Sequence, residues 1–128
     1  MKIIVLKFGG TSIGSINRIK KVARIVKSYT KKYKVIILSS AMSGTTNKLI
    51  DMSKKISANF ADNEYDTLVS AGEQISCSLL AGQLIENGIQ ARSLMAWQIP
   101  IITEGQHKHS RICLLYTSPS PRDLSTAR

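Results

Sequence analysis

Two short, continuously apolar runs constrain the fold of this chain more than any other feature of its 128 residues. Residues 3–8 (IIVLKF) and 34–40 (KVIILSS) flank residues 16–33, where apolar side chains recur at the spacing of an amphipathic helix. Apolarity that is continuous rather than alternating predicts strands that are buried on both faces. A strand, a helix and a strand in this order form a βαβ unit, and its right-handed crossover makes the two strands parallel.

The middle of the chain predicts further helices. We expect the first helix to begin near Ser15, and a second helix over residues 47–57. Residues 63–88 predict one or two helices, with a break near residues 70–72 and a C-terminal stop at Gly88.

The C-terminal part is less regular. Residues 89–103 predict one or two strands, interrupted by Pro100. Residues 113–128 contain the sequence Ser-Pro-Ser-Pro without apolar periodicity, which is typical of a flexible tail or of sequence foreign to the protein. We therefore expect one domain over residues 1–112, of class α/β, built as a three-layer sandwich around a mainly parallel sheet.

The charge of the chain is strongly basic. It has 18 Lys and Arg against 8 Asp and Glu, a formal net charge of +10. Many of the cations lie in residues 18–34, where they alternate with apolar residues as on the solvated face of a helix, and no aromatic stacking platform is interleaved with them. We favour the interpretation of these cations as the solvated face of a helix. A nucleic-acid site stays the alternative. An anionic small-molecule substrate fits the same charge.

Membrane and metal functions find no support in the sequence. No apolar run approaches the roughly 20 residues of a membrane-spanning helix, and the first apolar stretch is too short for a signal peptide. We therefore expect a cytoplasmic protein. Cys77 and Cys113 lack the spacing of a metal site or a redox pair, so we expect neither a disulfide nor a protein-bound metal. His107 and His109 could face one side of a strand, but a polar surface loop is the favoured interpretation.

The loop after the first predicted strand has the residue types of an anion site. Two glycines allow the backbone to approach a ligand, and their N–H groups attract anions together with the N-terminus of the next helix. A lysine adds a mobile charge, and two hydroxyls can donate or cap the helix. The order of residues differs from the P-loop and from the dinucleotide fingerprint, so we expect a phosphate loop of another kind. Its residues are Lys7, Phe8, Gly9, Gly10, Thr11 and Ser12.

Two later segments point to the same place. The loop SSAMSGTTN, residues 39–47, follows the second predicted strand and opens at the same edge of a parallel sheet as the first loop. Its hydroxyls, Ser40 and Thr46 among them, either cap the next helix or line a shared crevice. Glu73, in SAGEQIS, either complements the dipole in a first helical turn or presents a negative charge to that crevice, which would suit a substrate ammonium group.

Together, the motifs KFGGTS, SSAMSGTTN and LVSAGEQIS resemble those of aspartokinases, in the amino acid kinase superfamily, in order and in spacing. The resemblance covers residues 1–112 and implies the N-terminal, substrate-side half of that fold. It implies transfer of the γ-phosphoryl group of ATP, with Mg²⁺, to the β-carboxylate of L-aspartate. This reaction opens the route to lysine, threonine, methionine and diaminopimelate.

The resemblance also implies roles for single residues. Lys7 would contact the transferring phosphate as the catalytic residue, and residues 7–12 would bind ATP. Ser40, Thr46 and Glu73 would hold aspartate, with Glu73 at its α-ammonium group. The attacking carboxylate has a reference pKa of about 4, so it is ionised at neutral pH and needs no general base.

Finally, the resemblance implies what this chain lacks. In proteins of this family, the half of the kinase domain that binds the nucleotide follows the segment that is present here. We therefore expect the fragment alone to be inactive, and half of a continuous sheet to expose apolar surface. The full-length protein would be a homo-oligomer. A non-catalytic anion-binding or assembly module is the alternative function.

Overall fold

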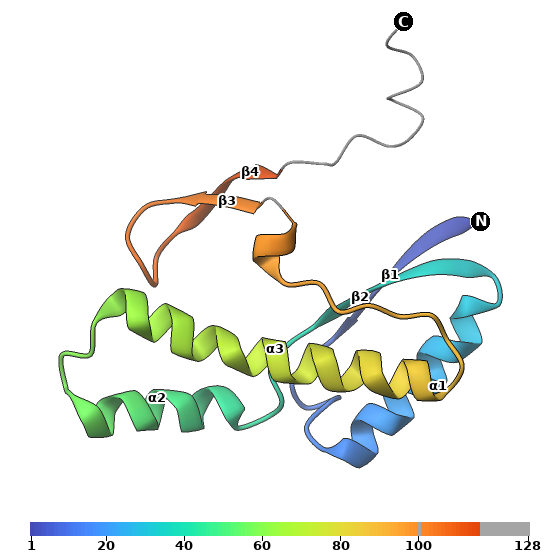
Figure 1. Ribbon diagram of the computed structural model, residues 1–128, viewed down its shortest axis with the longest axis horizontal. Helices are drawn as coiled ribbons and strands as arrows, with labels where there is room; N and C mark the ends of the chain where they lie inside the picture. Colours follow the sequence, from blue (N-terminus) through green and yellow to red (C-terminus); the bar gives the residue numbers. More distant parts are fainter. Residues whose placement is uncertain (100, 116–128) are drawn as a thin grey trace, which may run out of the picture. The chain divides into compact units, whose positions relative to one another are not determined.

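The computed structural model describes residues 1–99 and 101–115. The chain divides into two compact units, Met1–Ser93 and Leu94–Arg128. The first unit carries all of the predicted site residues (Figure 1). Its elements are β1 (Lys2–Phe8), α1 (Ile16–Thr30), β2 (Tyr33–Ser39), α2 (Thr45–Ile56) and α3 (Asp62–Glu86).

Strands β1 and β2 are parallel and in register from Lys2 opposite Tyr33 to Phe8 opposite Ser39. Helix α1 connects them, which confirms the predicted βαβ unit and the α/β class. The helix begins where the sequence predicts, because the extended Ser15 accepts a hydrogen bond from the N–H of Arg18 through its Oγ, at 3.3 Å. Both strands therefore end at one edge of the sheet, where the first two loops begin.

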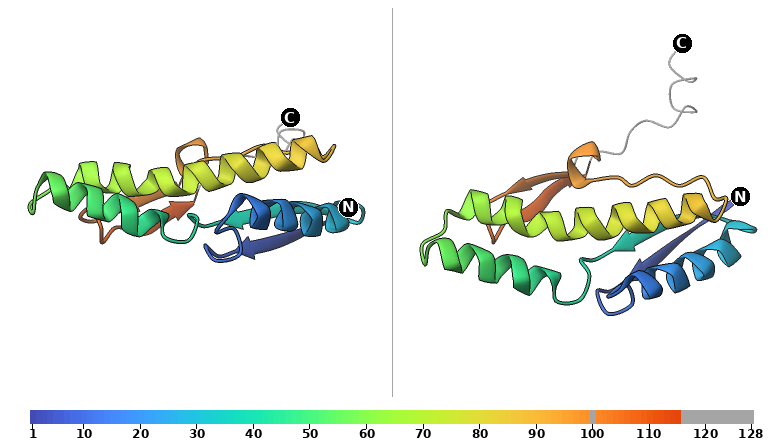
Figure 2. Two further views of the ribbon diagram at one scale, coloured as in Figure 1. Left: turned by 90° about the horizontal axis from the view of Figure 1, so that it is seen from below. Right: turned by 60° about the horizontal axis from the view of Figure 1, so that its bottom comes forward.

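The core lies between this pair of strands and the two helices α1 and α3. Figure 2 shows α1 and α3 running along the strands, with α2 antiparallel beside the first half of α3. Inward positions alternate along both strands, as the side-chain period of two requires. The side chains that meet in this core are Ile13, Ile19, Val22, Ala23, Val26, Leu80 and Leu84, with Leu6, Phe8, Val35 and Ile37 from the strands.

The opposite face of the two strands is apolar and open. Its four large apolar side chains are between 50% and 63% exposed, so the expectation of strands buried on both faces is wrong for this chain. The physical reason is that the described residues supply a helical layer against one face only. The four residues are Ile3, Val5, Ile36 and Leu38.

Helix α3 is a single, uninterrupted helix, so the predicted break near residues 70–72 is wrong. Gly72 serves packing instead, since a Cβ at this position would lie 3.0 Å from the Cβ of Ala41. The predicted stop at Gly88 is confirmed. Gly88 has a φ of 79°, and the N–H groups of Gly88 and Ile89 donate to the carbonyls of Ile85 and Leu84, at 2.9 and 3.0 Å.

The second unit contains a short 3₁₀ helix, Ala96–Gln98, and an antiparallel pair of strands, β3 (Ile101–Glu104) and β4 (Arg111–Leu115). One strand, β3, therefore begins within residues 89–103, as expected, and ends one residue beyond them. The two histidines lie in the turn between β3 and β4, which agrees with a polar loop.

The boundary predicted after residue 112 lies inside β4. The remainder of the predicted tail, residues 116–128, lies outside the described residues. Over residues 1–99 and 101–115, no helix has both the length and the apolar character needed to span a bilayer.

Candidate functional site

Two loops meet at the carboxyl edge of the strands: loop 1, residues 9–14, and loop 2, residues 40–44. The N–H of Ser40 donates to the carbonyl of Phe8 at 3.2 Å, and the N–H of Ser43 donates to the carbonyl of Gly10 at 3.1 Å. A Cβ on Gly10 would lie only 2.6 Å from the carbonyl oxygen of Ala41. Glycine is thus required at this position for the two backbones to touch.

The backbone carbonyls and the backbone N–H groups around loop 1 differ in their hydrogen bonding. Each carbonyl from Phe8 to Thr11 accepts at least one hydrogen bond from within the chain. The donors, in that order, are the N–H groups of Ser40, Ser12, Ser43 and Gly14, the last together with the guanidinium of Arg18.

By contrast, the N–H groups of Gly9, Gly10 and Thr11 find no acceptor among the described residues. They lie beside the N-terminus of α1, where the helix dipole adds positive potential. Backbone donors of this kind fit the oxygens of a phosphate group.

Loop 2 leads into a second helix N-terminus. The N-cap of α2 is Gly44, in the left-handed region with a φ of 82°, so no side chain caps the helix. The interpretation of the loop hydroxyls as an N-cap cluster is therefore wrong. Among residues 1–99 and 101–115, the hydroxyl of Thr46 has no hydrogen-bond partner, which leaves it available to a ligand.

Helix α3 brings Glu73 to loop 2. Its Oε1 accepts a hydrogen bond from the N–H of Ala41 at 3.2 Å. Because α3 begins at Asp62, Glu73 lies well inside the helix, and the alternative of a first-turn residue placed for the dipole is wrong. Glu73 contacts loop 2, and its role at a substrate crevice stays a prediction.

Lys7 and Phe8 point to opposite faces of β1. Phe8 packs against the hydrophobic core, so only its backbone takes part in the edge where the loops meet. Lys7 is exposed at the carboxyl end of the strand, opposite Leu38 in register. Within the described part of the chain, Lys7 makes no ion pair or side-chain hydrogen bond, so its ammonium group is not neutralised there.

Three residues of the site were not singled out by the sequence pattern: Ala41, Gly72 and Ser76. The available signal was the four-residue spacing of Gly72, Ser76, Leu80 and Leu84, which are the buried residues of α3. This spacing places all four on one face of a helix. The two small residues lie toward loop 2, and the two leucines lie in the core.

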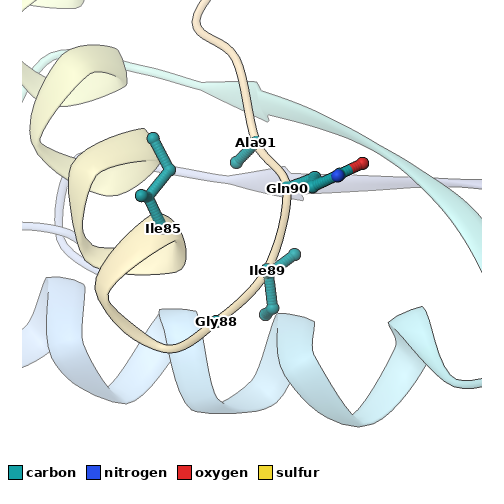
Figure 3. A pocket seen from close by; sticks show the side chains of 5 residues that line it. All are labelled: Ile85, Gly88, Ile89, Gln90 and Ala91. Carbon is teal, nitrogen blue, oxygen red and sulfur yellow. The ribbon is translucent and has the colours of Figure 1, made fainter.

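A separate, shallow hollow lies at the other end of α3 (Figure 3). Ile85 and residues 88–91 line it, and Figure 3 shows Ile89 pointing toward α1. It contains none of the predicted site residues, so the two loops and Glu73 stay the candidate site.

The sequence model of the amino acid kinase family matches residues 2–121. The aspartokinase of Geobacillus stearothermophilus is 46% identical over 125 residues, which are 97% of this chain and 31% of that protein. The aspartokinase of Rickettsia felis is 43% identical over 88% of this chain and 29% of its own length. A crystal structure of aspartate kinase from Synechocystis matches with a TM-score of 0.62 and 42% identity, over 66% of this chain and 15% of that one. The chain thus spans less than a third of the length of these curated relatives, 31% and 29% respectively.

Proposed function

The chain belongs to the amino acid kinase family, and from this premise we propose that it is the N-terminal, acceptor-side part of an aspartate kinase. The complete protein would transfer the γ-phosphoryl group of ATP to the β-carboxylate of L-aspartate. The similarity to two aspartokinases and to the structure of a third enzyme of that name supports this assignment. Because the chain spans about 31% of such relatives, we propose that it is inactive alone.

The observation that carries the proposal is the set of unpaired N–H groups in loop 1. Phosphoryl transfer between a carboxylate and a triphosphate brings anions together, so catalysis depends on positioning and on charge neutralisation. Gly9, Gly10 and Thr11 would donate to phosphate oxygens, with Ser12 beside them. Lys7 would add its charge where the transferred group passes. Mg²⁺ bound to the phosphates of ATP would supply the remaining neutralisation.

The acceptor side of the proposal rests on loop 2 and α3. A carboxylate nucleophile is ionised at neutral pH, so the site needs orientation rather than a general base. Ser40 and Thr46 would donate to the substrate carboxylates. Glu73 uses Oε1 for the N–H of Ala41, which leaves Oε2 to meet an α-ammonium group.

The first test replaces the corresponding segment of the Geobacillus stearothermophilus aspartokinase with this chain. We expect the hybrid to form an acyl phosphate that hydroxylamine traps, in a reaction that requires both L-aspartate and ATP. Lys7→Ala should lower kcat by about 100-fold or more, since it removes the positive charge that would stabilise the transferring phosphate group.

Lys34→Ala is the matched control. Lys34 is exposed on the same face of the strands, but at their opposite end, where it pairs with Ile3 in register. The control should keep full activity. If the Lys7→Ala hybrid were as active as the unsubstituted hybrid, the role of Lys7 would be refuted. A folded hybrid without activity, together with binding of tripolyphosphate by the chain itself, would favour the non-catalytic anion-binding module.

A further inference from the structure

We propose that Ser76 is a positioning residue of this site, and that Ser76 and Glu73 together fix the orientation of one peptide group in loop 2. The hydroxyl of Ser76 donates to the carbonyl of Ser40 at 2.7 Å. The Oε1 of Glu73 accepts from the N–H of Ala41 at 3.2 Å. This carbonyl and this N–H belong to the same peptide group, so α3 holds both of its polar atoms.

The helix geometry explains how two side chains reach one peptide group. Residues three apart in a helix are neighbours on one face, and here they lie beside the backbone that leaves β2. Gly72, one turn earlier, lets that backbone come close, because a side chain there would meet Ala41. Ser76 is 0% exposed, and its Oγ also accepts from the hydroxyl of Ser39 at 3.4 Å. The single proton of this hydroxyl has its shorter acceptor in the carbonyl of Ser40 and a longer one, at 3.1 Å, in the carbonyl of Glu73. The hydroxyl is therefore fully engaged inside the protein.

The two contacts also select the direction of the peptide group. An ionised carboxylate only accepts hydrogen bonds, so a flipped peptide would turn its carbonyl toward Glu73 and be repelled. The same flip would turn the carbonyl of Ser40 away from the hydroxyls of Ser76 and Ser39, which donate to it at 2.7 and 3.3 Å, and the loss of donors is costly for a part-buried carbonyl. The pair thus disfavours the alternative orientation of the loop.

The fixed peptide group sets the positions of two site elements. It determines where the backbone of Ser40 presents its side chain, and it places the carbonyl of Ala41 against Gly10 in loop 1. The same contact holds the carboxylate of Glu73, so that Oε2 is oriented before a ligand arrives. This inference rests on the proposed function for its substrate, because it makes the aspartate site preorganised.

Hydrogen exchange of the Ala41 amide in the full chain tests the positioning role without any assay of activity. Ser76→Ala should raise its exchange rate by about tenfold, since the lost hydrogen bond frees the peptide group. Glu73→Gln should leave the rate near that of the unsubstituted chain, because the amide oxygen of glutamine still accepts from Ala41. Glu73→Ala should raise the rate further.

Ser53→Ala is the matched control. Ser53 is also buried, and its hydroxyl donates to the carbonyl of Ile50 in its own helix, outside the site. Ser53→Ala should lower the midpoint of thermal unfolding about as much as Ser76→Ala does, while the exchange rate of the Ala41 amide stays unchanged.

Steady-state kinetics of the hybrid kinase separate this proposal from the proposed function. Ser76→Ala should raise the KM for aspartate by about tenfold with little change in the KM for ATP, a split that a loss of stability alone would not produce. Unchanged exchange and unchanged KM in Ser76→Ala, with the unsubstituted hybrid active, would overturn the positioning role and leave the kinase assignment intact. Faster exchange in a hybrid that does not use aspartate would overturn the assignment of the substrate.

Discussion

Ala41 is the residue at which the three parts of the candidate site meet. It is 4% exposed, and its N–H, carbonyl and Cβ each contact a different residue: Glu73, Gly10 and Gly72. Two of these contacts require glycine as the partner, because a side chain would occupy the space that Ala41 fills. A single methyl group added at either glycine should therefore disturb the site.

Gly10→Ala tests the close contact between loop 1 and the carbonyl of Ala41. The new Cβ would lie 2.6 Å from a backbone carbonyl that cannot rotate away, so we expect a loss of about 2 kcal/mol in the free energy of unfolding. Urea denaturation measures it.

Gly9→Ala is the control, since a Cβ at Gly9 has no atom within 4 Å and its φ is not positive. It should change the free energy of unfolding by less than about 0.5 kcal/mol. Equal losses in both variants would contradict the contact between Gly10 and Ala41.

At the scale of elements, one face of the 25-residue helix α3 contacts both loop 2 and the hydrophobic core. Its middle presents Gly72 and Ser76 to loop 2, and its C-terminal part presents leucines to the core. A change at the residues that face loop 2 therefore alters the site, whereas a change on the solvent side of the helix alters helix stability alone. Glycine occurs in both kinds of position, which allows a comparison within one helix.

Gly72→Ala and Gly82→Ala form that comparison. A Cβ at Gly82 has no atom within 4 Å, so alanine should stabilise the helix by about 0.5 to 1 kcal/mol through its higher helix propensity. At Gly72 the Cβ of Ala41 is 3.0 Å away, so steric crowding should outweigh this gain and give a net loss of about 1 kcal/mol. Thermal and urea unfolding measure both. A stabilised Gly72→Ala variant would show that loop 2 is not held where the structure places it.

At the scale of the molecule, the first unit covers one face of its strands and leaves the other open. Between Lys7 and Lys34, which lie at its two ends, the open face carries apolar side chains. In a complete core, the burial of each of these would contribute on the order of 1.5–3 kcal/mol. Val5 and Ile36 are register partners at its centre. We expect this surface to make the isolated chain associate with itself.

Val5→Thr combined with Ile36→Thr tests this expectation. Threonine keeps the strand propensity but is less apolar, so self-association measured by sedimentation should weaken by about tenfold or more, with the fold retained. Leu6→Thr, one residue along β1 on the core face, should instead destabilise the fold. Unchanged self-association in the double variant would mean that another surface carries it.

The local features of this protein follow from its sequence. Apolar runs of strand length, the Ser15 cap and Gly88 identify β1, β2, the start of α1 and the end of α3, because each depends on the dihedral preferences and hydrogen bonds of neighbouring residues. The composition of loop 1 likewise predicts an anion site before any coordinates are known. These are properties of short segments.

What only the tertiary structure decided are the contacts between segments far apart in the chain. The glycine at 72 looked like a helix break because local propensity counts its flexibility, whereas its role is to make room for Ala41. The spacing of Ser76 indicates a buried position on α3, but it does not identify the partner of its hydroxyl, since the carbonyl that it binds lies 36 residues earlier. Which strand face is covered also depends on the helices that pack against it, and continuous apolarity cannot tell a covered face from an open one.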